Sequence, residues 1–414
     1  MEMTFVILFS IASIVGILVR RTGIPYTIAL VLVGLGVGAL HVVEPPRLTK
    51  ELLFALFLPG LVFEAAYNIH VTELRASWRT IAVLAVPGVV LAILLTAGIM
   101  LAALHAFGLA LTVDWRFALV FAALVAATDP IAVVSLFRKL GVPARLTTLV
   151  EAESLFNDGT SIVVLSLVLA YVGGSATSVA ALSGQFALVI GGGALVGVLL
   201  SYGIAFLTRQ LDDPMIEITL TTVAAYGSFV LAEELHLSGV IATVCAGLVL
   251  GTYGREVTMS RTTRAAVDSF WEYVAFALNS IVFLLIGFAV QPANLMASAG
   301  AIVVGFVAVG LARFGVILGA RAMFNRTRER FSAAWATVMW WGGLRGALSM
   351  VLALSLPAGF PQRDLLVDMT FGVVLISIVL QGLTMQPLVA RLLPGARSPS
   401  PGTPPDDPDA ILAP

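Results

Sequence analysis

The sequence predicts an all-α, polytopic membrane protein with about 13 transmembrane helices. Two observations carry this prediction. Hydrophobic residues make up 59% of the 414 residues and charged residues only 11%, whereas a soluble domain carries roughly 25% charged residues. The apolar residues also form successive runs of about 20 residues, which is the length that crosses a bilayer. A large soluble enzyme is therefore excluded.

The expected spans are separated by short loops that contain charged residues, glycine or proline. The first stretch, MEMTFVILFS, lacks basic residues and a small-residue cleavage site, so we interpret it as the first span rather than a signal peptide. The predicted spans are 3–19, 24–40, 51–69, 79–105, 115–137, 148–171, 184–208, 216–234, 237–251, 268–290, 297–320, 332–356 and 365–392.

Basic residues are distributed unevenly between the two sets of alternate loops. The loops that follow odd-numbered spans hold most of the Lys and Arg residues, whereas the opposite set holds only Arg47, Lys50, Arg116 and Arg363. Cytoplasmic loops of membrane proteins are enriched in Lys and Arg. We therefore expect a multi-pass protein of the inner (plasma) membrane, with its N-terminus outside and its C-terminus in the cytoplasm.

The chain divides into a transmembrane domain at 1–393 and a tail at 394–414. The tail reads PGARSPSPGTPPDDPDAILAP, and its Pro, Ser and Asp content predicts a short disordered cytoplasmic segment. The sequence holds no phosphate-binding glycine loop. We therefore expect transport driven by an ion gradient, with no cofactor, no enzymatic activity and no nucleic-acid partner, in a protein whose surroundings are membrane lipid.

Two predicted spans are interrupted near their middle. Span 5 contains Thr128-Asp129-Pro130, and span 12 contains glycines on both sides of Arg345. Proline and clustered glycine open a helix. Because the two spans are seven apart, they run in opposite directions, which predicts inverted repeats at about 1–171 and 216–393 with span 7 as the linker. Discontinuous helices at corresponding positions of inverted repeats indicate the midplane site of a secondary transporter.

Span 6 carries the densest group of polar residues in the apolar part of the chain. The run LVEAESLFNDGTSIVV at 149–164 contains Glu151, Glu153, Ser154, Asn157 and Asp158. Ionisable residues inside a membrane span indicate a functional site. Removal from water favours the neutral form of a carboxyl group, so a proton can compete with a cation for Asp158. One acid that binds either ion alternately is a minimal antiporter.

Other polar residues are expected to support this acid. Broken helices expose dipole ends that require compensating charge, and Asp129 and Arg345 are placed to supply it at the N-terminal and C-terminal ends of the half-helices. A second interpretation of Asp129 stays open, in which its buried carboxylate caps the helix and binds no ion. Thr128 can offer an oxygen to a hard cation, Arg345 is expected to form an ion pair with Glu153, and Glu64 is expected to join the site through water or to control access to it.

Five short motifs, in order along the chain, resemble those of the NhaP-type sodium/proton antiporters, which belong with the animal sodium/proton exchangers to the monovalent cation:proton antiporter-1 family. The motifs are FE at 63–64, TDP at 128–130, FND at 156–158 after ES, VFLLIG at 282–287 and GGLRG at 342–346. The resemblance covers essentially all of the predicted spans.

The resemblance implies an NhaA-like antiporter fold that forms a homodimer, with a mobile core of spans 4–6 and 11–13 at about 79–171 and 297–393. It implies a Na⁺ site at Asp158, Asp129, Ser154 and Thr128, with Glu64 contributing through water. It also implies that three residues stabilise the core, namely Asn157, Glu153 and Arg345.

The resemblance further implies electroneutral exchange of one Na⁺ or Li⁺ for one proton, a function in cellular pH homeostasis. The residues agree, because neutral Asn157 leaves Asp158 as the single titrating acid of the pair, so that exchange moves no net charge. A K⁺/H⁺ antiporter remains an alternative, since a slightly larger site would suit K⁺. An ion-coupled symporter of organic anions and a gated cation channel are less favoured, because the sequence shows neither extra basic substrate groups nor a filter-like repeat.

Overall fold

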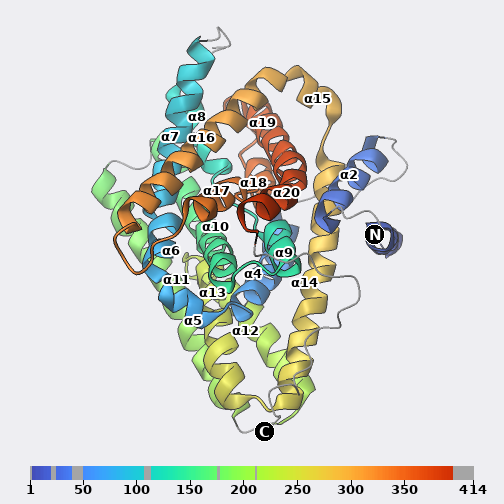
Figure 1. Ribbon diagram of the computed structural model, residues 1–414. Coiled ribbons are helices and arrows are strands. Elements are labelled where there is room, and N and C mark those ends of the chain that lie inside the picture. The colour runs from blue at the N-terminus through green and yellow to red at the C-terminus, as the bar shows by residue number, and fades with distance from the viewer. Residues whose placement is uncertain are drawn as a thin grey trace.

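The computed structural model describes residues 2–19, 25–39, 50–106, 113–174, 178–209 and 212–394. Across these residues the regular secondary structure is helical throughout and contains no strand (Figure 1). In this part of the chain, eight helices are long and apolar enough to cross a membrane, and four shorter apolar helices accompany them. The prediction of an all-α membrane protein is confirmed. The predicted tail lies, apart from Pro394, outside the described residues.

The elements are α-helices interrupted by three π-helical segments, η1–η3. Up to the middle of the chain they are α1 (Glu2–Val19), α2 (Tyr26–Ala39), α3 (Lys50–Leu52), η1 (Leu53–Phe57), α4 (Leu58–Tyr67), α5 (Val71–Ala76), α6 (Trp78–Ala85), α7 (Pro87–Ala106), α8 (Trp115–Leu124), α9 (Ile131–Leu140) and α10 (Ala144–Val172). They continue with α11 (Val179–Thr208), α12 (Pro214–Glu234), α13 (Gly239–Val249), η2 (Leu250–Thr258), α14 (Arg261–Ala289), α15 (Pro292–Ala297), α16 (Ala299–Phe324), α17 (Ala333–Trp341), α18 (Ala347–Leu354), α19 (Arg363–Ile376), η3 (Ser377–Gln381) and α20 (Gly382–Leu392).

The predicted spans correspond to these elements, and the two interrupted spans are pairs of half-helices. Span 5 is α8 and α9, and span 12 is α17 and α18. The prediction for span 9, 237–251, is wrong at its end, because α13 continues through η2 to Thr258. Apolar character falls at the sequence TYGREV, but Gly251 packs directly on the backbone of Tyr67. That close contact holds the polar segment against the bundle.

Polar side chains begin six of the helices in the described part of the chain. A helix leaves its first N–H groups without intrahelical acceptors, and a side-chain oxygen at the preceding residue can accept from them. Asp114, for example, accepts hydrogen bonds from the N–H groups of Arg116 and Phe117 at the start of α8. The same arrangement begins α11, α12, α13, α14 and α17, at Ser178, Asp213, Ser238, Ser260 and Ser332.

Helix α14 packs against α2 through small residues and runs along one side of the bundle (Figure 1). Gly34 faces the carbonyl group of Leu284, and Gly287 faces that of Val31, so closely that a Cβ atom at either glycine would overlap backbone. Small residues let membrane helices approach in this way. Helix α14 also contacts α1, α4 and α12, and it makes a smaller contact with α18, a half-helix of span 12.

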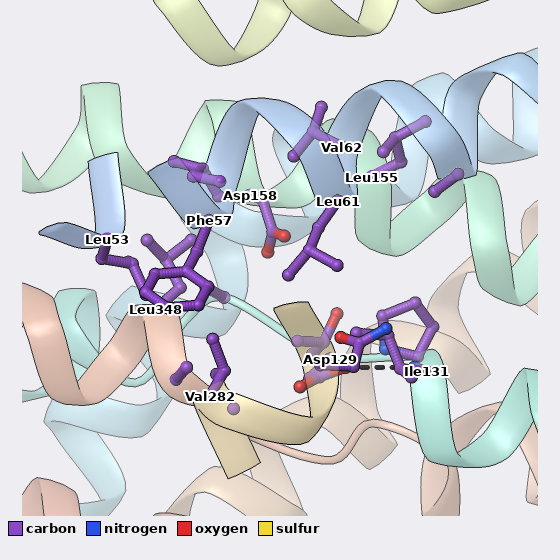
Figure 2. Close-up of a pocket in the computed structure, with 18 of the residues that line it drawn as sticks. Leu53, Phe57, Leu61, Val62, Asp129, Ile131, Leu155, Asp158, Val282 and Leu348 are labelled. Atoms are coloured by element: carbon purple, nitrogen blue, oxygen red, sulfur yellow. Dashed lines mark hydrogen bonds between the residues drawn. The ribbon is translucent and has the colours of Figure 1, made fainter. Parts of the chain in front are cut away.

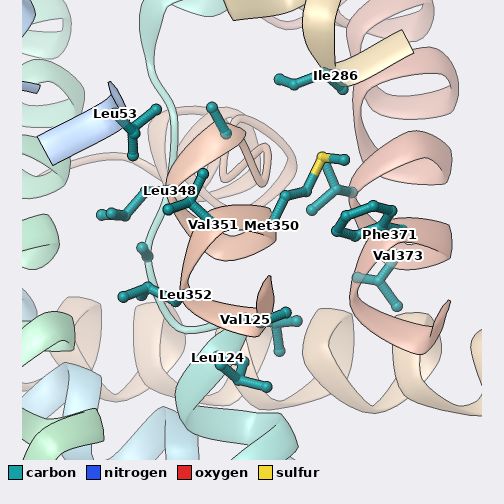
Figure 3. Close-up of a cluster of buried hydrophobic side chains, with 14 of the residues drawn as sticks. Leu53, Leu124, Val125, Ile286, Leu348, Met350, Val351, Leu352, Phe371 and Val373 are labelled. Atoms are coloured by element: carbon teal, nitrogen blue, oxygen red, sulfur yellow. The ribbon is translucent and has the colours of Figure 1, made fainter. Parts of the chain in front are cut away.

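The interrupted spans lie among a second group of contacts. Helix α10 packs on α6 and α8, α16 packs on α7 and α19, and α18 packs on α19. Figure 3 shows buried side chains of α18, with Leu352 on the side of Leu124 at the end of α8 and Met350 on the side of Phe371 of α19. Apolar packing thus holds the half-helix α18 in place, while its N-terminal end points toward the break in span 5.

Candidate functional site

The breaks in spans 5 and 12 cross each other. The backbone N–H of Asp129 donates a hydrogen bond to the carbonyl oxygen of Leu344 at 2.7 Å, which links the two unwound segments directly. The N–H of Arg345 donates to Ser377 Oγ in η3 at 2.8 Å. Gly346 lies so close to the Asp129 side chain that a Cβ atom would overlap the carboxyl group. The glycine is therefore required by the crossing itself.

Charged side chains lie at the ends of the half-helices. The guanidinium of Arg345 donates to the carbonyl oxygens of Val125, Ala126 (2.7 Å) and Ala127 (3.3 Å), just beyond the C-terminal end of α8. The carboxylate of Asp129 accepts from the N–H of Ile131, at the start of α9, at 3.0 Å. Cations are stabilised at helix C-termini and anions at helix N-termini. The sequence predicts this placement for both residues.

The predicted ion pair between Glu153 and Arg345 is wrong. Glu153 instead binds Arg313 of α16 through two parallel hydrogen bonds, Nη1–Oε1 and Nη2–Oε2, each 3.1 Å long. Arg313 also donates to the carbonyl oxygen of Met339 in α17, and its side chain lies against Gly343. The physical reason is that backbone carbonyl groups compete with Glu153 for the guanidinium of Arg345. The Arg345 guanidinium is directed to the free carbonyl groups after α8, which leaves Glu153 to the cation on α16.

A network of hydrogen bonds ties the break in span 5 to α10. Ser154 Oγ donates to the carbonyl oxygen of Thr128 at 2.8 Å, and the hydroxyls of these two residues lie 2.6 Å apart. Asn157 Nδ2 donates to Thr128 Oγ1 at 3.0 Å and to the carbonyl oxygen of Ala126 at 3.2 Å. Ser161 Oγ donates to Asn157 Oδ1 at 2.7 Å. Asn157 is thereby engaged through both of its polar atoms.

Asp158 faces a cavity beside this network. The cavity has a volume of about 100 Å³ and is bounded by α4, α10, α14, α18 and the break in span 5. Its polar lining includes Asp158, Asp129, Thr128 and Glu151, while apolar side chains such as Leu61 cover the rest (Figure 2). About 10–15 Å³ of such space is enough to hold one water. The cavity is therefore large enough for a small cation together with water.

The Oδ1 atom of the Asp158 carboxylate is buried and has no hydrogen-bond partner within the described residues. Figure 2 shows the carboxylate pointing from α10 into the cavity, on the side across from Asp129. A buried, unpaired carboxylate oxygen is costly unless it binds a proton or a cation. This atom is the strongest sign of a ligand at the site.

Glu64 lies outside the lining of this cavity. Its Oε1 atom accepts a hydrogen bond from Asn68 Nδ2 on the same helix at 2.9 Å. Glu151 lines the cavity instead and forms an ion pair with Arg138 at 3.2 Å. The carboxylates of Glu64 and Glu151 lie within electrostatic range of each other. Glu64 thus lies beside the site, on the helix whose Leu61, Val62 and Ala65 line the cavity.

The structure brings together most of the predicted site, but sequence reasoning missed two residues. Arg313 is the partner of Glu153, and Asn279 of α14 lines the cavity with a buried amide oxygen. Arg313 is a single polar residue within the apolar run LARFGVIL, and Asn279 and Ser280 interrupt the apolar run FALNSIVF. That isolation was a usable signal, since polar groups inside a membrane are expensive. It did not reveal which neighbour each residue faces.

Two interrupted helices that cross beside buried carboxylates, inside a bundle of apolar helices, define an ion-binding membrane protein. The family described as "sodium/hydrogen exchanger, transmembrane" matches residues 8–391. The chain belongs to this sodium/hydrogen exchanger family and is a multi-pass membrane protein. The resemblance seen in the sequence is thereby confirmed.

Three comparisons show how similar its relatives are. The chain is 40% identical to the Na(+)/H(+) antiporter ApNhaP of Aphanothece halophytica over 371 residues, which is 89% of this chain and 70% of that protein. It is 38% identical to the Na(+)/H(+) antiporter NhaP of Pseudomonas aeruginosa over 351 residues, or 84% and 82% of the two chains. The structure of the sodium proton antiporter MjNhaP1 from Methanocaldococcus jannaschii matches with a TM-score of 0.73 at 20% identity, covering 94% of this chain and 97% of that one. This last likeness concerns the fold.

Proposed function

We propose that this protein is a secondary active antiporter that exchanges Na⁺ or Li⁺ for protons. The observation that carries the proposal is the Oδ1 atom of Asp158, which has no hydrogen-bond partner in the described part of the chain and lies in a small cavity at the helix crossing. The names of its relatives, which are Na(+)/H(+) antiporters, support Na⁺ as the cation. They do not favour K⁺ exchange.

Cation and proton bind alternately to Asp158 in this proposal. Hard cations prefer oxygen ligands, and Asp129, Ser154 and Thr128 are proposed to complete the Na⁺ site. Support comes from the hydrogen bonds that hold Thr128 and Ser154 together beside the cavity and from the position of Asp129 in its wall. Glu64 is proposed to act through water. Its neighbours Leu61, Val62 and Ala65 on the same helix line the cavity, and so does Glu151, which pairs with Arg138.

The exchange is proposed to be electroneutral, with one cation moved for one proton. Asn157 carries no charge, and its amide group is bound to Thr128, Ala126 and Ser161. Asp158 therefore has no second acid next to it in the sequence. When a single carboxylate carries either a proton or a monovalent cation, the loaded core has the same charge in both directions, so the membrane potential does no work on it.

Alternating access is proposed to come from movement of the two core segments, 79–171 and 297–393, with inverted repeats at 1–171 and 216–393. The contacts among α10, α16, α18 and α19 and their neighbours support a unit that moves together. Helices α4 and α14 are proposed to belong to the fixed part. The cavity would then open to either side of the membrane as the crossing passes these two helices.

The proposed setting is the inner (plasma) membrane, with the N-terminus outside and the C-terminus in the cytoplasm. The unequal distribution of basic residues between the loops supports this orientation. The protein is proposed to act as a homodimer in lipid, without a cofactor, in pH homeostasis. Monovalent cations and protons are its substrates.

The test is transport by the purified protein in liposomes that carry an imposed pH gradient. A pH-sensitive dye reports the gradient as Na⁺, Li⁺ or K⁺ is added, with the membrane potential free or clamped. We expect Na⁺ and Li⁺ to dissipate the gradient at a rate that clamping does not change. If K⁺ alone dissipated the gradient, the transported cation would be K⁺ instead of Na⁺. A folded protein that shows no cation-dependent proton flux would overturn the proposal in favour of a symporter.

A further inference from the structure

One wall of the cavity is formed by α14, which is not part of the helix crossing. Asn279, Val282 and Phe283 line the cavity from this helix. Residues three and four positions apart share one face of a helix, so this face of α14 is directed at the site. Asn279 is the polar member of the three.

The amide oxygen of Asn279 resembles Oδ1 of Asp158, because both atoms are buried without a hydrogen-bond donor from the described residues. Its Oδ1 atom is buried, and no hydrogen-bond donor among the described residues reaches it. An amide oxygen removed from water without a donor is costly. Asp158 Oδ1 and Asn279 Oδ1 are thus two buried oxygens that lack donors and belong to residues lining one cavity.

A single kind of ligand satisfies both atoms. A desolvated monovalent cation accepts oxygen ligands from carboxylate, amide and water, whereas an anion would be repelled by Asp129 and Asp158. We propose that Asn279 provides its amide oxygen to the transported cation, directly or through one water, and so helps to set cation affinity and selectivity. This inference rests on the proposed antiport function and adds a ligand to its site.

The position of Asn279 on α14 also predicts how cation affinity changes between the two conformations. Helix α14 packs mainly on α2, and also on α4 and α12, with a smaller contact to α18, whereas Asp158 lies on α10. If α10 and the crossing move past α14, the cation keeps Asp158 and loses Asn279. The site would therefore bind the cation more tightly in the conformation described here than in the opposite one.

The experiment uses the full-length protein in the liposome assay, with the apparent KM and maximal rate measured separately for Na⁺ and Li⁺. Asn279→Leu removes the oxygen and keeps a similar volume. We expect it to raise the apparent KM for Na⁺ about 10-fold, with the maximal rate kept within about 2-fold, because a ligand was lost while the carboxylate chemistry was not. We expect Asn279→Gln, which keeps an amide oxygen without adding a charge, to hold the KM within about 3-fold of the parent protein.

Two controls separate a ligand from a structural residue. Asn294→Leu makes the same change at an exposed position on α15, and we expect unchanged kinetics. The rise in Tm on adding Na⁺ should be smaller for Asn279→Leu than for the parent protein, since a bound ion stabilises the fold according to its affinity. If the leucine variant does not fold, Asn279→Ala is judged by the same criteria.

The outcomes also distinguish this inference from the function on which it rests. If the parent protein shows no cation-dependent proton flux, the proposed function fails. If the parent protein exchanges Na⁺ and the leucine variant has the same KM and the same Na⁺-dependent Tm shift, Asn279 is not a ligand and this inference alone is overturned. A reduced maximal rate with unchanged KM would likewise contradict it.

Discussion

The side chains of Glu153 and Arg313 form a two-pronged ion pair in the protein interior, with both N–O distances at 3.1 Å. Both side chains are almost inaccessible. The pair joins α10, which carries Asp158, to α16, and through the carbonyl group of Met339 it also reaches α17. It therefore fixes the helix that carries the proposed ion-binding acid against the second interrupted span.

Removal of Arg313 should be strongly destabilising. An Arg313→Met substitution leaves the Glu153 carboxylate buried without its partner, which typically costs about 3–5 kcal/mol. We expect a clear fall in Tm in detergent, and Glu153→Gln in the same chain should add little, because the pair is already broken. Combining Glu153→Gln with Arg345→Met should give nearly additive losses. Additive losses for Glu153 and Arg313 would contradict the observed pairing.

Arg345 should be sensitive even to a conservative change. Its guanidinium donates to three successive carbonyl groups beyond α8, and lysine offers a compact charge instead of a planar fork. We expect Arg345→Lys to cost about 1–3 kcal/mol, since buried carbonyl groups lose donors, and to slow exchange. Thermal unfolding and liposome flux measure the two effects. If Arg345→Lys kept the stability and the exchange rate of the parent protein, the positive charge alone would account for the role of Arg345.

Gly346 should tolerate no side chain. A methyl group there would overlap the Asp129 carboxylate, so Gly346→Ala should push the two breaks apart. A displacement of about 1 Å at such a site can lower a rate by about 10-fold or more. The matched control is Gly310→Ala on α16, where a Cβ atom meets open space, and flux should be unchanged. Equal rates for the two variants would show that the crossing is not tightly fitted.

Asn157→Asp should affect both stability and charge movement. A carboxylate cannot donate to Thr128 Oγ1 and the Ala126 carbonyl group as the amide does, and each loss costs about 1–3 kcal/mol. The new acid also titrates beside Asp158. We therefore expect a lower Tm and an exchange rate that depends on the clamped membrane potential. A variant that is as stable as its parent and insensitive to potential would argue against the electroneutral role given to Asn157.

The sequence was sufficient for features that depend on local pattern. Apolar runs located the spans, and Thr128-Asp129-Pro130 and the glycines around Arg345 located both breaks, because hydropathy and helix-breaking residues act within a few positions. Partner choice was not local. Glu153 had two candidate arginines in the spans, and the selection of Arg313 depends on how α16 is rotated and on the carbonyl groups that engage Arg345.

Asn279 is a second case in which the local sequence does not reveal a contact with residues far away in the chain. An asparagine in an apolar run is visible in the sequence, but its position on the cavity wall follows from the packing of α14 beside α4 and α18. The end of span 9 was missed for a related reason, since contact between Gly251 and Tyr67 outweighs the polar composition of that segment. Each miss concerns a contact between residues far apart in the chain.

The central claim is that one carboxylate, Asp158, binds either the cation or the proton. It is tested most directly by the protons released when Na⁺ is added to the purified protein in weakly buffered solution, measured together with Na⁺ binding. We predict about one proton released for each Na⁺ bound, and neither binding nor release in Asp158→Asn at the same concentrations, with Tm showing that the variant is folded. Na⁺ binding without proton release in the parent protein, or undiminished release from Asp158→Asn, would contradict the claim.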